Sequence, residues 1–371
     1  MALDHVRDFF HDDAMVHDPL DLDTTTPALF FTRWITNFCA PAFVFLSGLS
    51  AYLSGLRKSV NNLSASLIKR GLWLIFIEIT VVTFGWTFNP YFETMVLQVI
   101  WAIGISMIVL GAACRLPQKW IWIIAIIILA GHNLLDNIPA THQGFSGFIW
   151  DMFHHAFSKY TLNASHNIFI VYPVLPWIGI MLLGYAFGQI FRPEIGIRKR
   201  KQTLWMIGSG MIIFFVLFRF FNLYGNPTPW HSQNNPVYSF LSFLDVCKYP
   251  PSLLFTCITL GPALLFLGTF ENKHSFITRF FCIFGRVPFF YYILHIYTIH
   301  ILTVLLFYSS GYNSMDIVTP GSFFLFRPAN LGYGLWFVYT MWAFVIMILY
   351  LPCKWYDEYK SKHQHWWLSY L

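Results

Sequence analysis

The sequence is poor in charge, and this shortage excludes most classes of soluble protein. Only 11% of its 371 residues are charged, whereas soluble domains carry about 25%. Hydrophobic residues make up 57% of the chain and the mean hydropathy is +0.56. Aromatic residues reach 20%, as is typical of proteins that lie against lipid. This balance predicts an integral membrane protein, with membrane lipid as its first partner.

Cysteine pairs and metal-binding motifs are also missing. The six cysteines form no CxxC pair and most lie inside apolar runs, so we expect neither a disulfide framework nor a zinc site at them. No HExxH motif occurs, and His5, His11 and His17 recur at a six-residue spacing that does not align on a helix. We therefore predict no bound metal. The net charge of +6 comes from short loops rather than a basic stripe, so we expect no nucleic-acid partner.

Long apolar runs are what the sequence has in abundance. A helix needs about 20 apolar residues to cross a bilayer. Such runs occur at about 35–55, 71–88, 95–114, 119–136, 171–191, 202–222, 251–270, 287–308 and 331–352. The expected fold class is all-α: a polytopic helical bundle with about nine transmembrane helices, in which residues 1–371 form a single domain. A homo-oligomer is compatible with such a bundle.

The basic residues predict the orientation of these helices. When the loops alternate across the membrane, 17 of the 23 lysines and arginines fall on one side, which the positive-inside rule makes cytoplasmic. The C-terminus is then cytoplasmic, and residues 1–34 face outward. A chain with nine crossings and a cytoplasmic C-terminus must begin outside, yet this sequence opens with residues that resemble the end of a helix. We therefore expect a preceding apolar helix in the parent form, ten in all.

The sharpest chemical signal lies in residues 4–13. If this segment is helical, His5 and Asp8 are spaced i,i+3 and Asp4 and Asp8 i,i+4, so all three share a face. A carboxylate can orient an imidazole and fix its tautomer. We therefore predict His5 as a general base or as a nucleophile that carries an acyl group, with Asp4 and Asp8 beside it. The alternative is a solvated polar cap over the outer mouth of the bundle.

Other polar residues lie within or beside apolar runs. Glu78 lies deep in its run, where an acid is either functional or held by a structural ion pair or hydrogen bond. His132 and Asp136 close another helix at i,i+4 and are candidate substrate contacts. Lys248 and Tyr249 precede a pair of prolines that suits a first helical turn. There Lys248 either holds an anionic group or extends toward the membrane surface.

A further candidate begins at residue 285. Arg286 lies beside a predicted helix N-terminus, which makes it a candidate phosphate site. Tyr291 and His295 follow on one face of the same helix. They either point into the bundle for function or form a structural polar pair.

Six blocks resemble a known family. Residues 4–10 (DHVRDFF), 21–34 (DLDTTTPALFFTRW) and 39–48 (CAPAFVFLSG) closely resemble the short bacterial members of the heparan-alpha-glucosaminide N-acetyltransferase family. Residues 84–90 (FGWTFNP), 248–253 (KYPPSL) and 285–295 (GRVPFFYYILH) look like later blocks of that family. The resemblance covers nearly the whole chain.

The resemblance implies a membrane acyltransferase that takes acetyl from acetyl-CoA on the cytoplasmic side and delivers it to a sugar amine on the other. His5 best matches the histidine tied to transfer, whether as base or as acyl carrier. The substrate-binding residues expected from position are Arg33, Glu78, His132, Asp136, Lys248 and Tyr249. The residues expected to bind acetyl-CoA are Arg286, Tyr291 and His295.

Two departures from the family affect these expectations. Family members begin with an apolar helix that contains an Arg-Gly pair before the Asp-His pair, whereas this chain starts after it. The large lumenal N-terminal domain of the animal enzyme is absent, so the resemblance implies an envelope glycan rather than lysosomal heparan sulfate as acceptor.

Two other functions are compatible with the sequence. The main alternative is a transporter or permease for a small or lipid-linked solute, because polar residues in a helical bundle also mark transport pathways. Internal repeats would favour it, and the two halves share none that we recognise. A sensor that reads pH or metal through the outer histidines and aspartates is the third possibility.

Overall fold

The structure is a computed structural model that describes residues 1–271, 273, 275–319 and 322–369. It is mostly helical, with 68% of residues in helices. Its internal contacts divide the chain into two compact units. Unit 1 comprises residues 1–36, 79–94 and 272–371, and unit 2 comprises residues 37–78 and 95–271.

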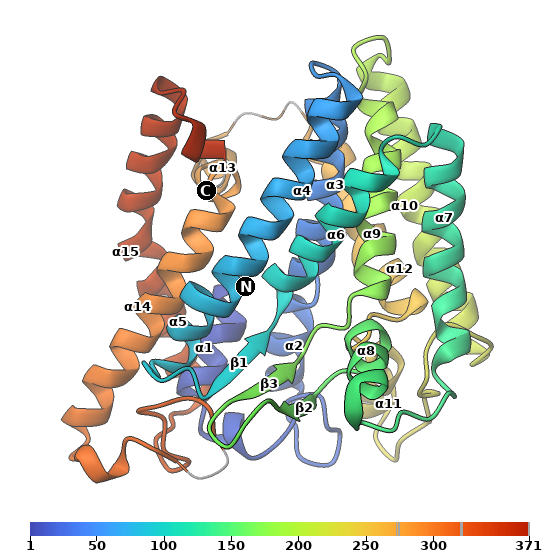
Figure 1. Ribbon diagram of the computed structural model, residues 1–371. Helices are drawn as coiled ribbons and strands as arrows, with labels where there is room; N and C mark the ends of the chain where they lie inside the picture. The colour runs from blue at the N-terminus through green and yellow to red at the C-terminus, as the bar shows by residue number, and fades with distance from the viewer. Residues whose placement is uncertain (272, 274, 320–321, 370–371) are drawn as a thin grey trace. The chain divides into compact units, whose positions relative to one another are not determined.

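Unit 2 is built on long helices that lie side by side (Figure 1). The packed pairs are α3 (Cys39–Gly55) with α9 (Leu175–Phe187), α4 (Val60–Ile77) with α6 (Val99–Ala113), α10 (Ile197–Phe220) with α12 (Leu253–Phe270), and α7 (Gln118–Gly131) with α9. The α3 and α9 backbones meet at Gly48 and Gly184. A Cβ atom on Gly48 would lie 2.1 Å from the carbonyl oxygen of Met181, so the crossing requires a residue without a side chain.

Short elements gather at one end of these helices (Figure 1). They are η3 (His132–Leu135), α8 (Gly144–His154), α11 (Pro236–Leu244), and the strands β1 (Thr94–Leu97), β2 (Ser158–Thr161) and β3 (Asn167–Ile170). A further short element, η4 (Gly188–Phe191), continues from the other end of α9. The strands form one sheet in the order β1-β3-β2, and β2 pairs antiparallel with β3. The expected all-α class is therefore incomplete. The sheet escaped prediction because four-residue strands are too short to show an alternating pattern.

Arg219 fixes a long connection to α10. Its side chain is only 2% exposed and donates hydrogen bonds to four backbone carbonyl oxygens. These belong to Thr228 at 2.6 Å, Ser242 at 2.9 Å, Phe243 at 3.1 Å and Asp245 at 2.5 Å. One guanidinium group thus satisfies carbonyls along the segment 228–245, because its five donors point outward in a fixed plane.

Unit 1 combines the first helix of the chain with its last ones. Its elements are α1 (Ala2–Phe10), η1 (Asp12–Met15), α2 (Pro27–Thr36), α5 (Thr83–Thr87), α13 (Phe276–Arg286), α14 (Pro288–Ser309), η5 (Ser314–Asp316), α15 (Leu335–Lys362) and η6 (Trp366–Ser369). Helix α1 packs against α14, α15 and α2, and α13 packs against α15. Val287, Cys353, Tyr356 and Leu368 form a buried cluster among these helices.

The predicted membrane crossings are only partly reproduced. Among the described residues, six helices are long and apolar enough to span a membrane: 27–55, 118–135, 197–220, 253–270, 288–309 and 335–362. Each overlaps a predicted run, while the runs at 95–114 and 171–191 correspond to shorter apolar helices. The run at 71–88 is interrupted by η2 (Glu78–Val82), a π-helical turn between α4 and α5. The predicted number of nine is therefore not confirmed.

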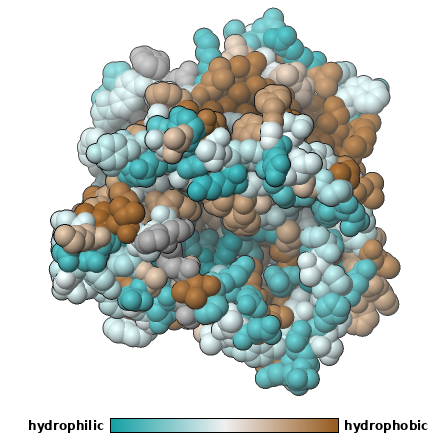
Figure 2. All heavy atoms as spheres, turned by 60° about the horizontal axis from the view of Figure 1, so that its bottom comes forward, coloured by the Kyte–Doolittle hydropathy of each residue, from teal (hydrophilic) through white to brown (hydrophobic). Residues whose placement is uncertain are grey.

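The outward faces of the long helices carry large apolar side chains. Ile127 on α7 is 64% exposed, Phe266 on α12 64% and Leu351 on α15 70%. In Figure 2, hydrophilic side chains are frequent on the face turned to the viewer, and hydrophobic ones form larger areas toward the edge of the view. Exposed apolar area of this kind requires a cover other than water, so these faces suit contact with lipid.

Candidate functional site

Helix α1 meets the condition under which Asp4, His5 and Asp8 share a face, and it positions these first candidates. Val6, Phe9 and Phe10 are buried along it, which fixes the orientation of the helix by packing. The helix ends at Phe10, and His11 is already extended, with φ of −76° and ψ of 139°. His11 therefore lies beyond the helical face shared by Asp4, His5 and Asp8, because the periodicity of the helix no longer applies to it.

His5 contacts His295 on α14. The His5 Nδ1 atom lies 2.7 Å from His295 Nε2, and the two rings are stacked with their centroids 4.9 Å apart. Trp86 lies edge-on to His5 at 4.7 Å between centroids. The sequence prediction assigned His295 to acetyl-CoA binding; the structure brings it next to the predicted catalytic histidine.

The hydrogen bonds of this pair fix a tautomer. His295 Nδ1 lies 2.9 Å from the carbonyl oxygen of Tyr291, and because a carbonyl only accepts, this nitrogen must carry the hydrogen. In a neutral His295, Nε2 is then an acceptor, and Nδ1 of His5 donates to it. The lone pair of a neutral His5 is therefore on Nε2. A nitrogen in this state can remove a proton or attack a carbonyl carbon.

The two acidic candidates beside His5 are bound to arginines. Asp4 pairs with Arg7 and Arg33, each at 3.1 Å, and Asp8 pairs with Arg7 at 2.5 Å. Both arginines are less than 10% exposed. The ion pair between Arg33 and Asp4 holds α2 against α1. The predicted role of Asp4 and Asp8 in orienting His5 is not tested by these contacts and stays a prediction.

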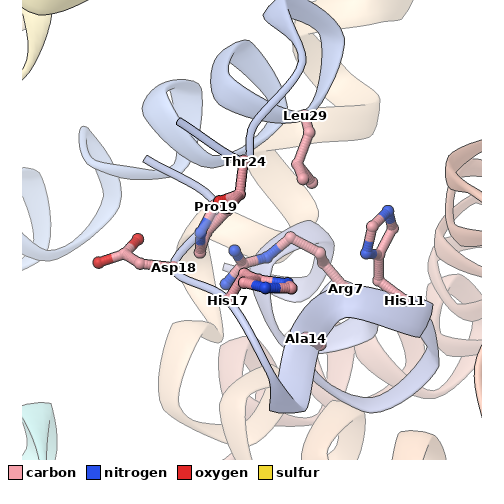
Figure 3. A pocket seen from close by; sticks show the side chains of 8 residues that line it. All are labelled: Arg7, His11, Ala14, His17, Asp18, Pro19, Thr24 and Leu29. Carbon is pink, nitrogen blue, oxygen red and sulfur yellow. The ribbon is translucent and has the colours of Figure 1, made fainter. Parts of the chain in front are cut away.

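A small pocket lies beside Arg7. Its free space is only about 10 Å³, which is about the space that one water molecule requires. Its lining residues are Arg7, His11, Ala14, His17, Asp18, Pro19, Thr24 and Leu29. Figure 3 shows the Arg7 side chain in the middle of this group, whereas the Asp18 carboxylate points away from it. The one cationic side chain of the pocket that belongs to α1, Arg7, is already paired with Asp4 and Asp8.

Sequence reasoning missed Arg327, which holds the end of α1. Its side chain is fully buried and donates to the carbonyl oxygens of His11 at 2.7 Å and Pro328 at 2.8 Å. Burial lowers the pKa of Arg327 to about 10, opposed by Tyr312 and the nearby acids Asp12 and Asp8. The guanidinium group stays charged at neutral pH. No local pattern could reveal it, since His11 is 316 residues away in the sequence.

The proposed acetyl-CoA residues lie on neighbouring parts of unit 1. Arg286 is the last residue of α13 and directly precedes Val287, the N-cap of α14, so it lies beside a helix N-terminus as predicted. Its side chain is 66% exposed in an ion pair with Asp357 at 3.0 Å. Tyr291 stacks on His295 with centroids 5.1 Å apart. From Pro288, where α14 begins, to His295 the helix advances about 10 Å. Their role in binding the donor is not tested here.

The remaining predicted substrate contacts belong to unit 2. The fully buried Glu78 accepts a hydrogen bond at 2.7 Å from the backbone N–H of Gln98, which caps α6. This contact matches the structural alternative considered for Glu78. Lys248 is 8% exposed and lies over the Tyr249 ring at 5.1 Å, and the Tyr249 hydroxyl donates to that of Tyr172 at 3.4 Å. Their substrate role stays a prediction.

His132 and Asp136 have a partner that the sequence did not indicate. His154, the last residue of α8, places its Nε2 atom 3.0 Å from Asp136 Oδ1. The His132 and His154 rings lie edge-to-face with centroids 5.7 Å apart. Both histidines are buried. The i,i+4 spacing of His132 and Asp136 suggested a shared location, but nothing in the spacing of residues 132–154 pointed to the third member.

Comparison with known proteins identifies one family. The model of the family described as "Heparan-alpha-glucosaminide N-acetyltransferase, catalytic" matches residues 10–219. The matched region contains the blocks at 21–34, 39–48 and 84–90. It leaves out His5 and the blocks at 248–253 and 285–295. No curated protein and no solved structure gives a significant match.

Proposed function

The chain belongs to the heparan-alpha-glucosaminide N-acetyltransferase catalytic family, and from this premise we propose that it transfers acetyl from acetyl-CoA to the amino group of an envelope sugar, with His5 at the reacting atoms. Family membership and the apolar helices identify it as an integral membrane protein of an acetyltransferase family. The proposal concerns the identity of the donor, the identity of the acceptor and the residues that carry out the transfer.

The observation that carries the proposal is the chain of contacts from Tyr291 through His295 to His5. It directs the Nδ1 hydrogen of His5 into the protein and leaves Nε2 as the basic nitrogen. A histidine with an oriented ring and a fixed tautomer is a better general base than a rotating one. His295 can also support His5 after protonation, because its Nε2 atom still accepts the Nδ1 hydrogen.

The reaction that suits this arrangement is direct acyl transfer. The acceptor amine attacks the thioester carbonyl carbon, a C–N bond forms, and the C–S bond breaks as the tetrahedral intermediate collapses. His5 Nε2 takes the proton that the amine loses and returns it to the departing thiolate. The products are the N-acetylated sugar and CoA with a free thiol, and His5 ends as it began.

A covalent route uses the same nitrogen. In this variant His5 Nε2 attacks the thioester first and carries the acetyl group, which the acceptor amine then removes. Rapid mixing of enzyme and acetyl-CoA without acceptor separates the two routes. A burst of CoA equal to the enzyme concentration indicates the acyl carrier, and its absence indicates the base.

The donor is expected at the α13–α14 junction. Arg286 is exposed enough to meet the phosphates of CoA, and Tyr291 and His295 follow along α14 toward His5. The basic loops on the same predicted side support a cytoplasmic donor. A cytoplasmic C-terminus in a bacterial inner membrane belongs to this proposal as well.

The test measures CoA thiol release by the purified protein in lipid nanodiscs, with acetyl-CoA and glucosamine as substrates. We expect turnover in the wild type and a loss of about 100-fold or more in His5→Ala. His363→Ala, which removes an exposed histidine at the end of α15, is the matched control and should keep wild-type turnover. Full activity of His5→Ala would remove His5 from the reaction. Solute uptake without thiol release in the wild type would favour a transporter instead.

A further inference from the structure

Unit 2 holds a cluster of possible metal ligands outside the proposed reaction site. His132, Asp136 and His154 each offer one ligand atom, and these atoms lie within 4.8 Å of one another. His132 is 2% exposed and His154 is 1% exposed. The cluster joins the end of α7 to the end of α8, which are separated by a connection of irregular structure.

The carboxylate of this cluster is held in place from behind. Asp136 Oδ2 accepts a hydrogen bond at 2.8 Å from the side-chain amide of Asn133. The amide oxygen of Asn133 accepts in turn from the backbone N–H of Leu253 at 2.9 Å. Asp136 therefore directs Oδ1 toward the histidines with its second oxygen already occupied. Outer contacts of this kind orient the ligands of metal sites.

The histidines have nitrogens that the described residues leave without a hydrogen bond. These nitrogens are Nδ1 and Nε2 of His132 and Nδ1 of His154, and all three are buried. The backbone of Pro251 approaches the His132 ring, but without the geometry of a hydrogen bond. Buried imidazole nitrogens are costly to leave unpaired. A bound ion beside Asp136 would pair one nitrogen of His132, whose ring has no hydrogen bond among the described residues.

We propose that His132, Asp136 and His154 bind one divalent zinc ion. Two imidazole nitrogens and one carboxylate oxygen are a donor set typical of zinc, whereas calcium and magnesium select oxygen ligands. The ion takes the place of the hydrogen between His154 Nε2 and Asp136. The nitrogen of each histidine that binds zinc must therefore carry no proton. Three protein ligands leave the fourth position for water or another ligand.

The zinc ion has a structural consequence in unit 2. It ties η3 to α8, and through Asn133 it is linked to the first residue of α12. An ion that binds the folded chain and not the unfolded chain raises its stability. We therefore expect zinc to act on the thermal stability of the protein, independently of whether the chain transfers acetyl groups.

The test begins with the wild-type protein, purified without a polyhistidine tag, stripped with a chelator and re-supplied with zinc. Elemental analysis after gel filtration should give about one zinc per chain, and zinc should raise the midpoint of thermal unfolding by several degrees. His132→Ala and His154→Ala should each lower zinc content at least tenfold at the same free zinc concentration and remove the shift. His231→Ala, which changes an exposed histidine elsewhere in unit 2, should behave as wild type.

X-ray absorption of the zinc-loaded wild type keeps the proposal falsifiable if the variants do not fold. We expect two imidazoles and at least one oxygen around the ion. Zinc uptake well below one per chain, retention of zinc in both alanine variants, or an absorption spectrum without two imidazoles would each overturn the site. None of these readouts depends on acetyl transfer, so this site and the proposed activity can fail separately.

Discussion

His295 on α14 accepts the Nδ1 hydrogen of His5 on α1 across 2.7 Å, although 290 residues separate the two in the sequence. The carbonyl of Tyr291 determines which nitrogen of His295 is the acceptor. In the proposed reaction, His295 thus acts on His5 through a hydrogen bond rather than on the substrate.

Replacing His295 tests this positioning role. His295→Ala should lower kcat by about 100-fold and leave KM for acetyl-CoA nearly unchanged, because it disturbs the orientation of His5 and not the binding of the donor. His295→Gln should recover part of kcat, since its amide oxygen can accept the Nδ1 hydrogen. Steady-state thiol release measures both constants. A rise in KM for acetyl-CoA with unchanged kcat would indicate instead that His295 binds the donor, as the sequence first suggested.

Removing the Arg286 side chain tests the donor site. Arg286→Ala should raise KM for acetyl-CoA about tenfold by removing one charge from the phosphates, with kcat little changed. Unfolding should be nearly unaffected, because an ion pair that is 66% exposed on one side contributes about 1 kcal/mol at most. Arg279→Ala, an exposed arginine on the same helix, is the control. An equal KM change in both variants would indicate general electrostatic attraction instead.

The pH dependence of stability can be tested at His155, which follows α8. Burial and the neighbouring His154 lower its pKa from the ordinary value of 6.5. The unfolded chain therefore takes up the proton more readily than the folded one. The stabilising contribution is present above about pH 6.5 and is lost as the pH falls below it. In protein stripped of metal, so that zinc at His154 does not contribute, thermal unfolding should show a smaller decrease from pH 7.5 to 5.5 in His155→Gln than in the wild type. Equal decreases would contradict the assignment.

The contact between α3 and α9 predicts a large effect of one methyl group. Gly48→Ala should lower the free energy of unfolding by about 1–3 kcal/mol, because the new Cβ atom meets the backbone of α9 and the helices must separate. In Gly210→Ala on α10 the Cβ atom meets no atom within 4 Å, so that variant should be unchanged or up to about 1 kcal/mol more stable. Thermal unfolding of the wild type and both variants in the same detergent measures these differences in stability. Equal stabilities would mean that the helices adapt without cost.

Local patterns explain why part of this structure could be predicted. Six apolar runs corresponded to helices long enough to cross a membrane, because burial in lipid leaves a continuous hydrophobic signal. The shared face of Asp4, His5 and Asp8 was predicted on the condition that their segment is helical, and α1 meets that condition. The run at 71–88 failed because hydropathy contains no sign of the π-helical turn at Glu78.

Long-range contacts explain why the rest could not be predicted. The spacing of His5 and Asp8 suggested a carboxylate beside the imidazole, but no local pattern indicated the contact of His5 with His295 on α14. His154 and Arg327 likewise depend on how distant segments pack. A single sequence gives residue types and local periodicity, and neither indicates which distant segments come into contact.

Arg219 shows how one side chain can decide whether a surface segment moves. Residues 228–245 have no sheet to hold them, but four of their carbonyl groups converge on this guanidinium. Lifting the segment away would strand a positive charge that is sealed from solvent. The segment must therefore travel with α10 as one body, and it is ill suited to serve as a gate that opens and closes during turnover.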